Sequence, residues 1–157
     1  MAVEIERKFL VRGDYKPFIT ASFRIIQGYL SSVPERTVRV RIKGDQAFLT
    51  VKGRGSRSGM SRFEWETKIS VKDAQNLLDL CEPGKIDKTR HLVQSAGQRF
   101  EVDEFHGDNQ GLVLAELEIS SEEEKIQIPD WLGKEVTGQK KYYNAMLKDN
   151  PFKNWPK

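Results

Sequence analysis

The sequence predicts an α+β fold dominated by strands, with an eight-stranded antiparallel β-barrel and a few flanking helices. Apolar and polar residues alternate with period two along most of the chain, which is the pattern of half-buried strands. Short runs of glycine, proline, asparagine and aspartate separate the alternating segments and favour antiparallel neighbours. Closure into a barrel would remove the exposed edges of such a sheet. The length of 157 residues suits a single domain, which we predict to span residues 1–157.

The alternating segments define eight predicted strands. Turn residues join several of them directly, most clearly around Pro34, Gly44 and Gly97. The predicted strands are 3–11, 23–32, 35–43, 47–53, 60–69, 84–93, 98–105 and 112–119.

Two segments have helical periodicity instead. Ser70 and Asp73 resemble a capping box, apolar residues then recur at helical spacing, and Pro83 ends the predicted helix. A second helix is predicted over 138–148. Segments 16–21 and 121–125 are each expected to hold one or two helical turns. The tail 150–157, rich in proline and lysine, is expected to be flexible.

Composition argues against several classes of protein. No segment approaches the ~18 consecutive apolar residues of a membrane-spanning helix. Charges at positions 4 to 8 replace the apolar region of a signal peptide, so we expect a cytoplasmic protein. The single cysteine, Cys81, excludes an internal disulfide and lies in an apolar run, where a packed thiol is expected.

Charged residues gather on one face of seven of the predicted strands. Because side chains alternate between the faces of a strand, residues two apart share a face. The other face of each strand is mainly apolar. The charged sets, strand by strand, are Glu4, Glu6 and Lys8; Arg39 and Arg41; Lys52; Glu64 and Glu66; Lys88 and Arg90; Glu101 and Asp103; Glu116 and Glu118.

A solvated outer face would explain any one of these strands. It does not explain the sorting by sign, because adjacent like charges repel and contribute nothing to solubility. A shared polar site does explain it. Arginine and lysine suit phosphate oxygens, carboxylate pairs suit a hard divalent cation, and an eight-stranded barrel holds about one small ligand. The pattern therefore predicts a metal-chelated polyphosphate inside the barrel.

Other interpretations fit less well. The interleaved glutamates argue against nucleic acid as a partner, and Phe63 and Trp65 fall on the apolar faces, where core packing explains them. His91 falls on the face opposite to Lys88 and Arg90, and His106 adjoins a turn, so neither is expected to act as a base in the site. No His/Cys cluster supports zinc. Four further features are expected to lie outside the site or at its edge: Lys43 and Lys68 in solvent, Arg7 on the surface or in a salt bridge, and the glycine-rich segment 53–59 as a flexible turn near a barrel mouth.

The order of the charged motifs resembles the CYTH superfamily, the triphosphate tunnel metalloenzymes. The opening E-x-E-x-K, from Glu4 to Lys8, is similar to the signature of that family. The resemblance extends from residue 3 to about 147. The other matching motifs, in order, are Arg39-x-Arg41, Thr50-x-Lys52, Glu64-x-Glu66, Lys88-x-Arg90, Asp103 and Glu116-x-Glu118.

The resemblance implies a β-tunnel with charges on the inside and a C-terminal helix as a plug. It implies phosphate binding by Lys8, Arg39, Arg41, Lys52, Lys88, Arg90 and, from the plug, Lys141, with Lys140 as the alternative. It implies Mg²⁺ or Mn²⁺ as cofactor, with Glu4, Glu6, Glu116, Glu118 and Asp103 as the candidate metal ligands. The catalytic set implied is Glu4, Glu6, Lys8, Lys52, Glu64 and Glu66, and Glu101 is a further acidic candidate.

The implied activity is metal-dependent hydrolysis of a triphosphate, with inorganic tripolyphosphate as substrate and pyrophosphate and phosphate as products. Three alternatives stay open within the same tunnel: a class IV adenylate cyclase, a thiamine triphosphatase and a non-catalytic polyphosphate-binding module. The expected partner is the small-molecule triphosphate, with no membrane, and the chain is expected to be a monomer or a homodimer.

Overall fold

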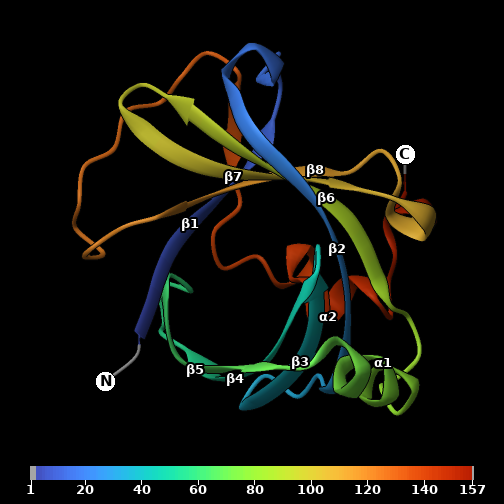
Figure 1. The fold of residues 1–157 in the computed structure, drawn as a ribbon. Coiled ribbons are helices and arrows are strands. Elements are labelled where there is room, and N and C mark those ends of the chain that lie inside the picture. The colour runs from blue at the N-terminus through green and yellow to red at the C-terminus, as the bar shows by residue number, and fades with distance from the viewer. Residues whose placement is uncertain (1–2, 157) are drawn as a thin grey trace.

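The computed structural model describes residues 3–156, which form one antiparallel sheet closed into a barrel (Figure 1). The strand order is β5-β4-β3-β2-β6-β7-β8-β1-β9, and a further pairing of β5 with β1 closes the ring. The predicted eight-stranded barrel is confirmed, with β9 as an additional strand. The strands are β1 (Val3–Val11), β2 (Ile19–Ser31), β3 (Arg36–Lys43), β4 (Gln46–Gly55), β5 (Ser61–Ile69), β6 (Ile86–Ser95), β7 (Gln98–Phe105), β8 (Val113–Glu118) and β9 (Leu132–Glu135).

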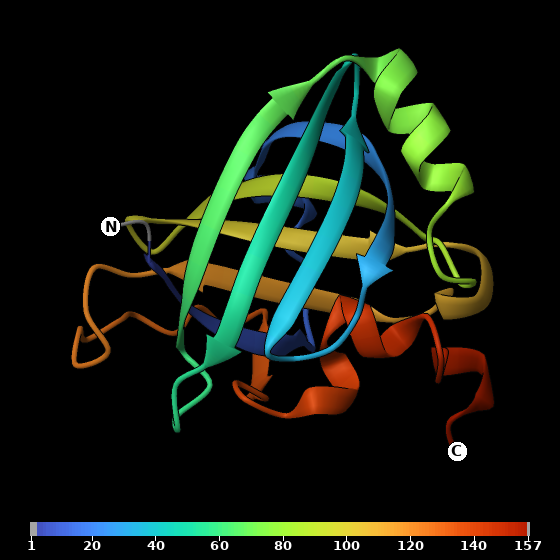
Figure 2. The same ribbon diagram turned by 90° about the horizontal axis from the view of Figure 1, so that it is seen from below.

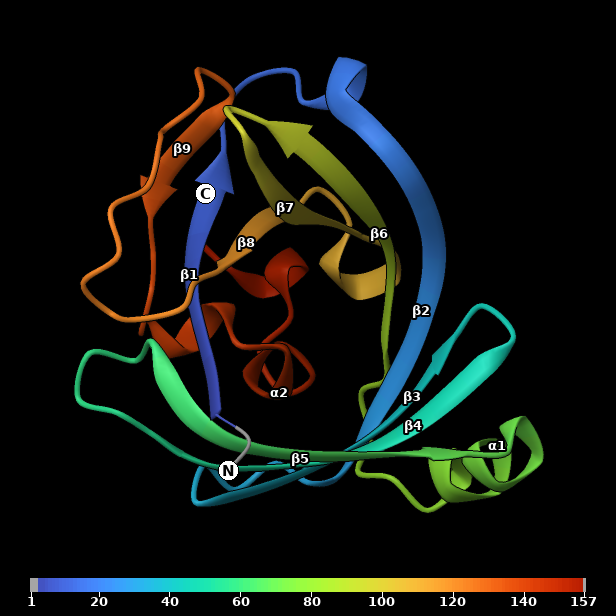
Figure 3. The same ribbon diagram turned by 60° about the vertical axis from the view of Figure 1, so that its left-hand side comes forward.

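The additional strand β9 follows from how β1 closes the barrel. One edge of β1 pairs with β8, while the other pairs with β5 only over residues 3–5 and with β9 from Phe9 to Val11. Figure 3 shows β9 running beside β1, away from β5. We did not predict β9, because LGKE is short and has no alternation. Directly after β9, the Val136 N–H donates to the Lys8 carbonyl at 2.8 Å, so β9 leads the chain back to the barrel.

The other differences from the predicted elements are small. Strand β2 begins at Ile19 instead of residue 23, after a three-residue 3₁₀ turn η1 (Lys16–Phe18). Segment 121–125 forms turns without a helix. The predicted first helix is confirmed as α1 (Val71–Asp79), capped by the Ser70 hydroxyl, which accepts from the Asp73 N–H at 3.0 Å. Within residues 3–156, no helix has the length and apolar character needed to cross a membrane.

Much of the apolar core lies outside the barrel wall. One cluster packs Phe9 and Phe100 on the outer face of the sheet against Trp131, in the segment before β9. A second cluster places α1 over the outer face of β3 and β4, where Ala74 and Leu78 meet neighbours such as Val40. Because these outward faces form the core, the opposite faces of the same strands point into the barrel.

Part of the outer face is uncovered, in contrast to the prediction that core packing explains Phe63 and Trp65. Phe63 and Trp65 of β5 and Val3 of β1 are exposed, Trp65 at 48%. Figure 2 shows the reason: α1 covers only one end of the β3–β4–β5 face. Phe9, which has the same outward parity in β1, is buried by Trp131 and its neighbours.

One end of the barrel is closed by apolar side chains. Ile86 and Leu114 lie two residues from Lys88 and Glu116, on the same inward face. They belong to a cluster with Leu147, from the C-terminal part of the chain. Figures 1 and 3 show this part of the chain, including α2 (Asn144–Leu147), within the ring of strands. The inward face therefore changes from charged to apolar toward the plugged end.

The plug itself is less regular than predicted. In place of one helix over 138–148, the chain forms a 3₁₀ turn η3 (Lys140–Tyr142), an extended residue Tyr143 and the single turn α2. Gly138 has φ +78°, a conformation that glycine adopts without steric cost. The irregular backbone turns Tyr142 into the apolar cluster and leaves Asn144 on the cavity side.

The segment after the plug is packed, which differs from the flexible tail we predicted for 150–157. Pro151 is buried, and Trp155 meets Phe152 and Tyr142 with ring centroids 5.2 and 5.3 Å apart. These residues lie in and around η4 (Phe152–Asn154), beside η2 (Gly107–Asn109). Lys157 lies outside the described residues. The aromatic side chains pack the segment because they cover the apolar closed end of the barrel.

Replacing Leu147 with alanine should lower the free energy of unfolding by about 3 kcal/mol, because its fully buried side chain fills the closed end. Urea denaturation measures the change. Met146→Ala in the same turn is the control, since Met146 is 37% exposed and should cost less than about 1 kcal/mol. Equal effects of the two substitutions would show that the apolar closure is absent in solution.

Candidate functional site: a charged tunnel

A cavity of about 740 Å³ occupies the barrel interior, between the strands and the plug. Side chains of both charges line it, and basic ones are more numerous. The charged lining residues are Glu4, Glu6, Lys8, Glu35, Arg39, Arg41, Lys43, Lys52, Arg54, Arg57, Arg62, Glu64, Glu66, Lys88, Arg90, Glu101, Glu116 and Lys140. The structure thus brings together most of the predicted site residues, from strands far apart in the sequence.

Three predicted site residues do not line the cavity. Glu118 is exposed at the end of β8, paired in register with Glu6. Asp103 is 2% exposed, beneath the lysine and arginine side chains that do reach the cavity. Lys141 turns outward from the plug, and its ammonium lies 4.6 Å from the Trp155 ring centroid, whereas Lys140 lines the cavity. For these three residues the predicted direct contact with metal or phosphate is therefore not supported by their placement.

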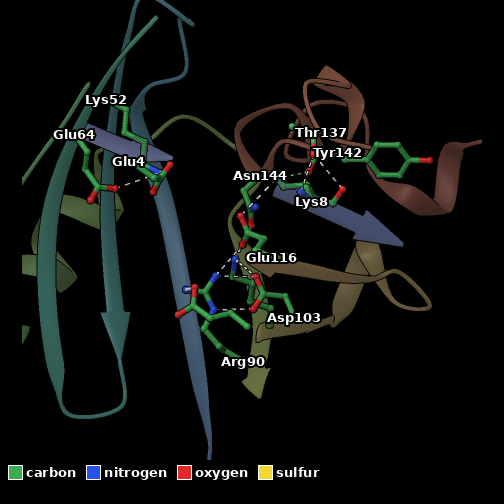
Figure 4. A network of polar contacts seen from close by, with 12 residues as sticks. Glu4, Lys8, Lys52, Glu64, Arg90, Asp103, Glu116, Thr137, Tyr142 and Asn144 are labelled. Carbon is green, nitrogen blue, oxygen red and sulfur yellow. Dashed lines mark hydrogen bonds and ion pairs between the residues drawn. The ribbon is translucent and has the colours of Figure 1, made fainter. Parts of the chain in front are cut away.

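Asp103 anchors two cations of the tunnel. Its carboxylate accepts from Lys88 Nζ at 2.7 Å and from Arg90 Nε and Nη2 at 2.8 and 2.9 Å (Figure 4). Burial alone would raise the pKa of Asp103, but the charges of Arg90 and Lys88 outweigh burial and lower it far below its usual value. Asp103 stays ionised and holds both cations from the side that faces away from the cavity.

Arg41, and also Lys88 despite its bond to Asp103, are buried without enough compensating negative charge. Burial, with the nearby guanidinium groups of Arg39 and Arg90, lowers the pKa of Arg41 to about 9. Burial likewise lowers the pKa of Lys88 to about 7, with Arg90 and Arg41 adding to the effect against the opposing charge of Asp103. Both shifts mean that an anion in the cavity would stabilise these side chains in their charged forms.

One donor in this group lacks a partner. Among the described residues, Arg39 Nε is the buried side-chain nitrogen or oxygen without a hydrogen bond. Arg39 Nη2 donates to the Thr50 hydroxyl at 3.2 Å, and the Thr50 hydroxyl donates to Glu66 at 2.6 Å. A buried unsatisfied donor is costly, so this arrangement is suited to an acceptor supplied by a ligand.

Carboxylates crowd an adjacent part of the tunnel. Burial, followed by the charges of Glu116 and Glu4, raises the pKa of Glu6 well above its usual value. Burial and a hydrogen bond with Glu4 raise the pKa of Glu64. Lys52 Nζ contacts Glu4 at 2.8 Å and Glu64 at 3.4 Å (Figure 4). Repulsion among these carboxylates is what a bound cation would relieve.

The carboxylate cluster has the donor chemistry of a hard divalent cation. Its geometry is not that of a finished site, because in residues 3–156 no three carboxylate, imidazole or thiolate groups are arranged to hold a metal ion. The reason is visible in the contacts: Lys52 engages Glu4, while Lys8 and Arg90 lie 3.9 and 3.3 Å from Glu116. A cation bound by Glu4, Glu6 and Glu116 would replace these lysine and arginine contacts.

The structure also adds residues that we did not predict. Lys43 lines the cavity, although we had placed it in solvent, and its ammonium lies 4.6 Å above the Phe23 ring. Arg62 shares the parity of Glu64, so alternation alone would have revealed it. Arg54 and Arg57 lie in segment 53–59, which reaches the cavity as predicted.

The remaining predictions concern residues outside the cavity. His91 does not line it; the ring bonds to Ser22 at 2.6 Å and Glu104 at 3.1 Å. His106 bonds to Thr89. Arg7 forms the predicted salt bridge, with Glu135. Cys81 is half-buried, and burial raises the pKa of its thiol, as expected for a packed cysteine.

The fold and the cavity define a class: a closed β-tunnel with a charged interior suited to an anionic ligand. The family model described as CYTH domain matches residues 2–148. An inorganic triphosphatase of Acetivibrio thermocellus is 44% identical over 99% of both chains. An inorganic triphosphatase of Nitrosomonas europaea is 36% identical, with 92% of this chain and 95% of the relative covered. The chain belongs to the CYTH family.

A solved structure supports the same family assignment. The structure of an inorganic triphosphatase aligns with a TM-score of 0.68 and 34% identity, covering 94% of this chain and 95% of the other. The fold of this chain therefore corresponds to one known from experiment. Membership of this family implies dependence on a divalent metal in general.

Replacing Glu6 with glutamine should stabilise the protein in EDTA at pH 7. Its pKa is raised in the folded state, so ionisation of Glu6 destabilises that state relative to the unfolded chain. The advantage should be greatest at neutral pH and vanish as pH falls below the ordinary value of 4.5, where Glu6 is protonated in both states. Urea denaturation across this range measures it.

Glu118→Gln is the matched control, because Glu118 is exposed beside Glu6 in the register. It should leave the stability nearly unchanged at both ends of the pH range. A Glu6→Gln variant less stable than the wild type at pH 7 would contradict the crowding of carboxylates.

Proposed function

We propose that this chain is a divalent-metal-dependent triphosphatase that hydrolyses inorganic tripolyphosphate to pyrophosphate and phosphate. The observation that carries the proposal is the surplus of buried cations around a cavity of about 740 Å³, including the unpartnered Nε of Arg39. A short polyanion is the ligand that would satisfy such a group. The relatives named inorganic triphosphatase, which match nearly the whole chain, favour the inorganic substrate.

The basic residues are proposed to bind the phosphate chain. Lys8, Arg39, Arg41, Lys52, Lys88 and Arg90 all line the cavity, and Lys43, Arg62 and Lys140 extend this basic surface. Arginine offers paired donors for phosphate oxygens, whereas lysine offers a compact charge. Together they would stabilise the negative charge that develops on the phosphoryl oxygens during transfer, which is the main protein contribution in this chemistry.

The acidic residues are proposed to hold the metal and the water. Glu4, Glu6 and Glu116 are the proposed ligands of Mg²⁺ or Mn²⁺, because oxygen donors suit both ions. When bound, the ion supplies Lewis-acid polarisation of a phosphoryl oxygen. Glu64, which is hydrogen-bonded to Glu4, and Glu66 both line the cavity, and they are proposed to orient the attacking water and accept its proton. Glu101 also lines the cavity and lies 3.4 Å from Arg90, a contact suited to holding that arginine in place.

The closed end of the barrel fits a small substrate. The apolar cluster around Leu147 and the plug occupies one end, so the substrate would enter from the other. Exclusion of water from the closed end would strengthen the electrostatic interactions in the site. A cytoplasmic location and the oligomeric state remain predictions.

Phosphate release from tripolyphosphate tests the activity directly. With Mg²⁺ or Mn²⁺ we expect equal amounts of phosphate and pyrophosphate, and no release in EDTA. ATP and thiamine triphosphate, assayed in parallel with product identification, test the cyclase and the thiamine triphosphatase alternatives. Tight binding of tripolyphosphate without turnover in any metal would instead identify a binding module and overturn the proposal.

Replacing Arg41 with alanine should raise KM for tripolyphosphate and lower kcat, together reducing kcat/KM by about 100-fold or more, because its charge contacts both substrate and transition state. Steady-state phosphate release measures both constants. Arg36→Ala is the matched control, since Arg36 is exposed at the start of β3 and does not line the cavity. Wild-type kinetics for Arg41→Ala would place phosphate binding elsewhere.

A further inference from the structure

Asn144 connects the plug to the cations of the tunnel. It is the first residue of α2 and lines the cavity. Its side-chain carbonyl accepts a hydrogen bond from Lys88 Nζ at 2.9 Å, and another from Gln27 Nε2 at 3.3 Å (Figure 4 shows Asn144 among the cavity residues). One amide oxygen of the plug therefore contacts side chains from two strands of the barrel.

Gln27 extends this connection to a second cation. It is fully buried in β2, and its carbonyl accepts from Arg41 Nε at 2.8 Å. Its amide also lies 3.2 Å from the Tyr29 hydroxyl. A continuous hydrogen-bonded chain thus runs from Arg41 through Gln27 and Asn144 to Lys88, and it joins β3, β2, the plug and β6.

Asn144 differs in kind from the acidic partners of the same cations. Asp103 fixes Lys88 and Arg90 with a full negative charge, which offsets part of their attraction for phosphate. Asn144 and Gln27 are neutral acceptors. They orient Lys88 and Arg41 and leave the positive charge available to a polyanion. A lysine on a flexible four-carbon stem benefits most from such a directional partner.

The position of Asn144 is fixed by the apolar closed end. Leu147, one turn later, is fully buried in the cluster, and Tyr142, two residues earlier, packs against Trp155. Tyr143 precedes Asn144 in extended conformation, and Lys8 Nζ lies 5.3 Å from its ring centroid. The packed residues on both sides place the amide in the cavity, so closure of the barrel end determines the geometry of the cations.

We propose that Asn144 is a positioning residue for triphosphate hydrolysis, which holds Lys88 directly and Arg41 through Gln27 in the orientation that the reacting phosphates require. This inference rests on the function proposed above. Asn144 itself performs no proton transfer or metal binding in this role. Loss of its acceptor leaves Lys88 Nζ with the bond to Asp103 but without the bond to the plug, so the ammonium is held in a different direction relative to the phosphate chain.

The test compares Asn144→Leu with wild type in tripolyphosphate hydrolysis. We expect kcat/KM to fall by about 10- to 100-fold, mainly in kcat, because loss of orientation affects the transition state more than charge-driven binding. Isothermal titration of tripolyphosphate in EDTA should show affinity within about threefold of wild type. Asn144→Ala, with a smaller side chain, provides a second variant if the leucine is not accommodated.

Leu78→Ala is the control for a purely structural effect. Leu78 is buried between α1 and the outer face of β3 and β4, away from the plug and the cavity, so its loss should lower the melting temperature and leave kcat within about threefold. Gln27→Met completes a double-mutant cycle. If Asn144 acts partly through Gln27, the double variant should lose less activity than the product of the two single losses.

The outcomes separate this inference from the proposed function. An inactive wild type would overturn both. An active wild type with wild-type kcat in Asn144→Leu, or with fully independent effects of Gln27 and Asn144, would overturn the positioning role alone. Equal losses of kcat in Asn144→Leu and Leu78→Ala at equal loss of stability would also overturn it, since the effect would then be structural.

Discussion

The ion pairs of Asp103 with Lys88 and Arg90 are the interaction on which the tunnel depends. Closing the sheet with its charged faces inward removes these groups from water, and a buried charge is tolerated only when it is paired. Asp103, at 2% exposure, compensates the two cations from behind and leaves their cavity sides open. The compensation is incomplete: the pKa of Lys88 is still lowered to about 7, the pKa of Arg41 is lowered to about 9, and Arg39 Nε has no hydrogen bond. A polyanion, as in the proposed function, would complete this pairing.

The same logic applies with opposite sign to the carboxylates. Glu4 and Glu116 have basic partners, whereas the pKa of Glu6 is raised by burial and by those two neighbours. A cation and a polyanion that bind together would relieve both imbalances. One cavity therefore holds incompletely paired cations next to mutually repelling carboxylates. The apolar residues stabilise the barrel by packing on the outer face of its wall and inside its closed end.

Several features were predictable because they depend on local sequence. Alternation with period two identified all eight barrel strands, and parity identified most of the cavity lining, including Arg39 and Lys88. The differences between prediction and structure share a cause: parity shows which face of a strand a residue occupies but not where along the barrel it lies. Glu118 has the inward parity yet lies exposed at the end of β8. Lys43, at the end of β3, lines the cavity instead of lying in solvent as expected.

The sequence by itself determined the barrel, its charged interior and the sign of each charged strand, because strand periodicity is a local property of the backbone. Tertiary structure alone decided which charges meet. Asp103 proved to be an anchor beneath Lys88 and Arg90, β9 formed because β1 parts from β5 beyond Ile5, and the C-terminal aromatic residues packed over the closed end. These outcomes depend on register, curvature and contacts between distant segments. The hydrogen-bonded chain from Arg41 to Asn144 is of the same kind, since its members come from separate strands and from the plug.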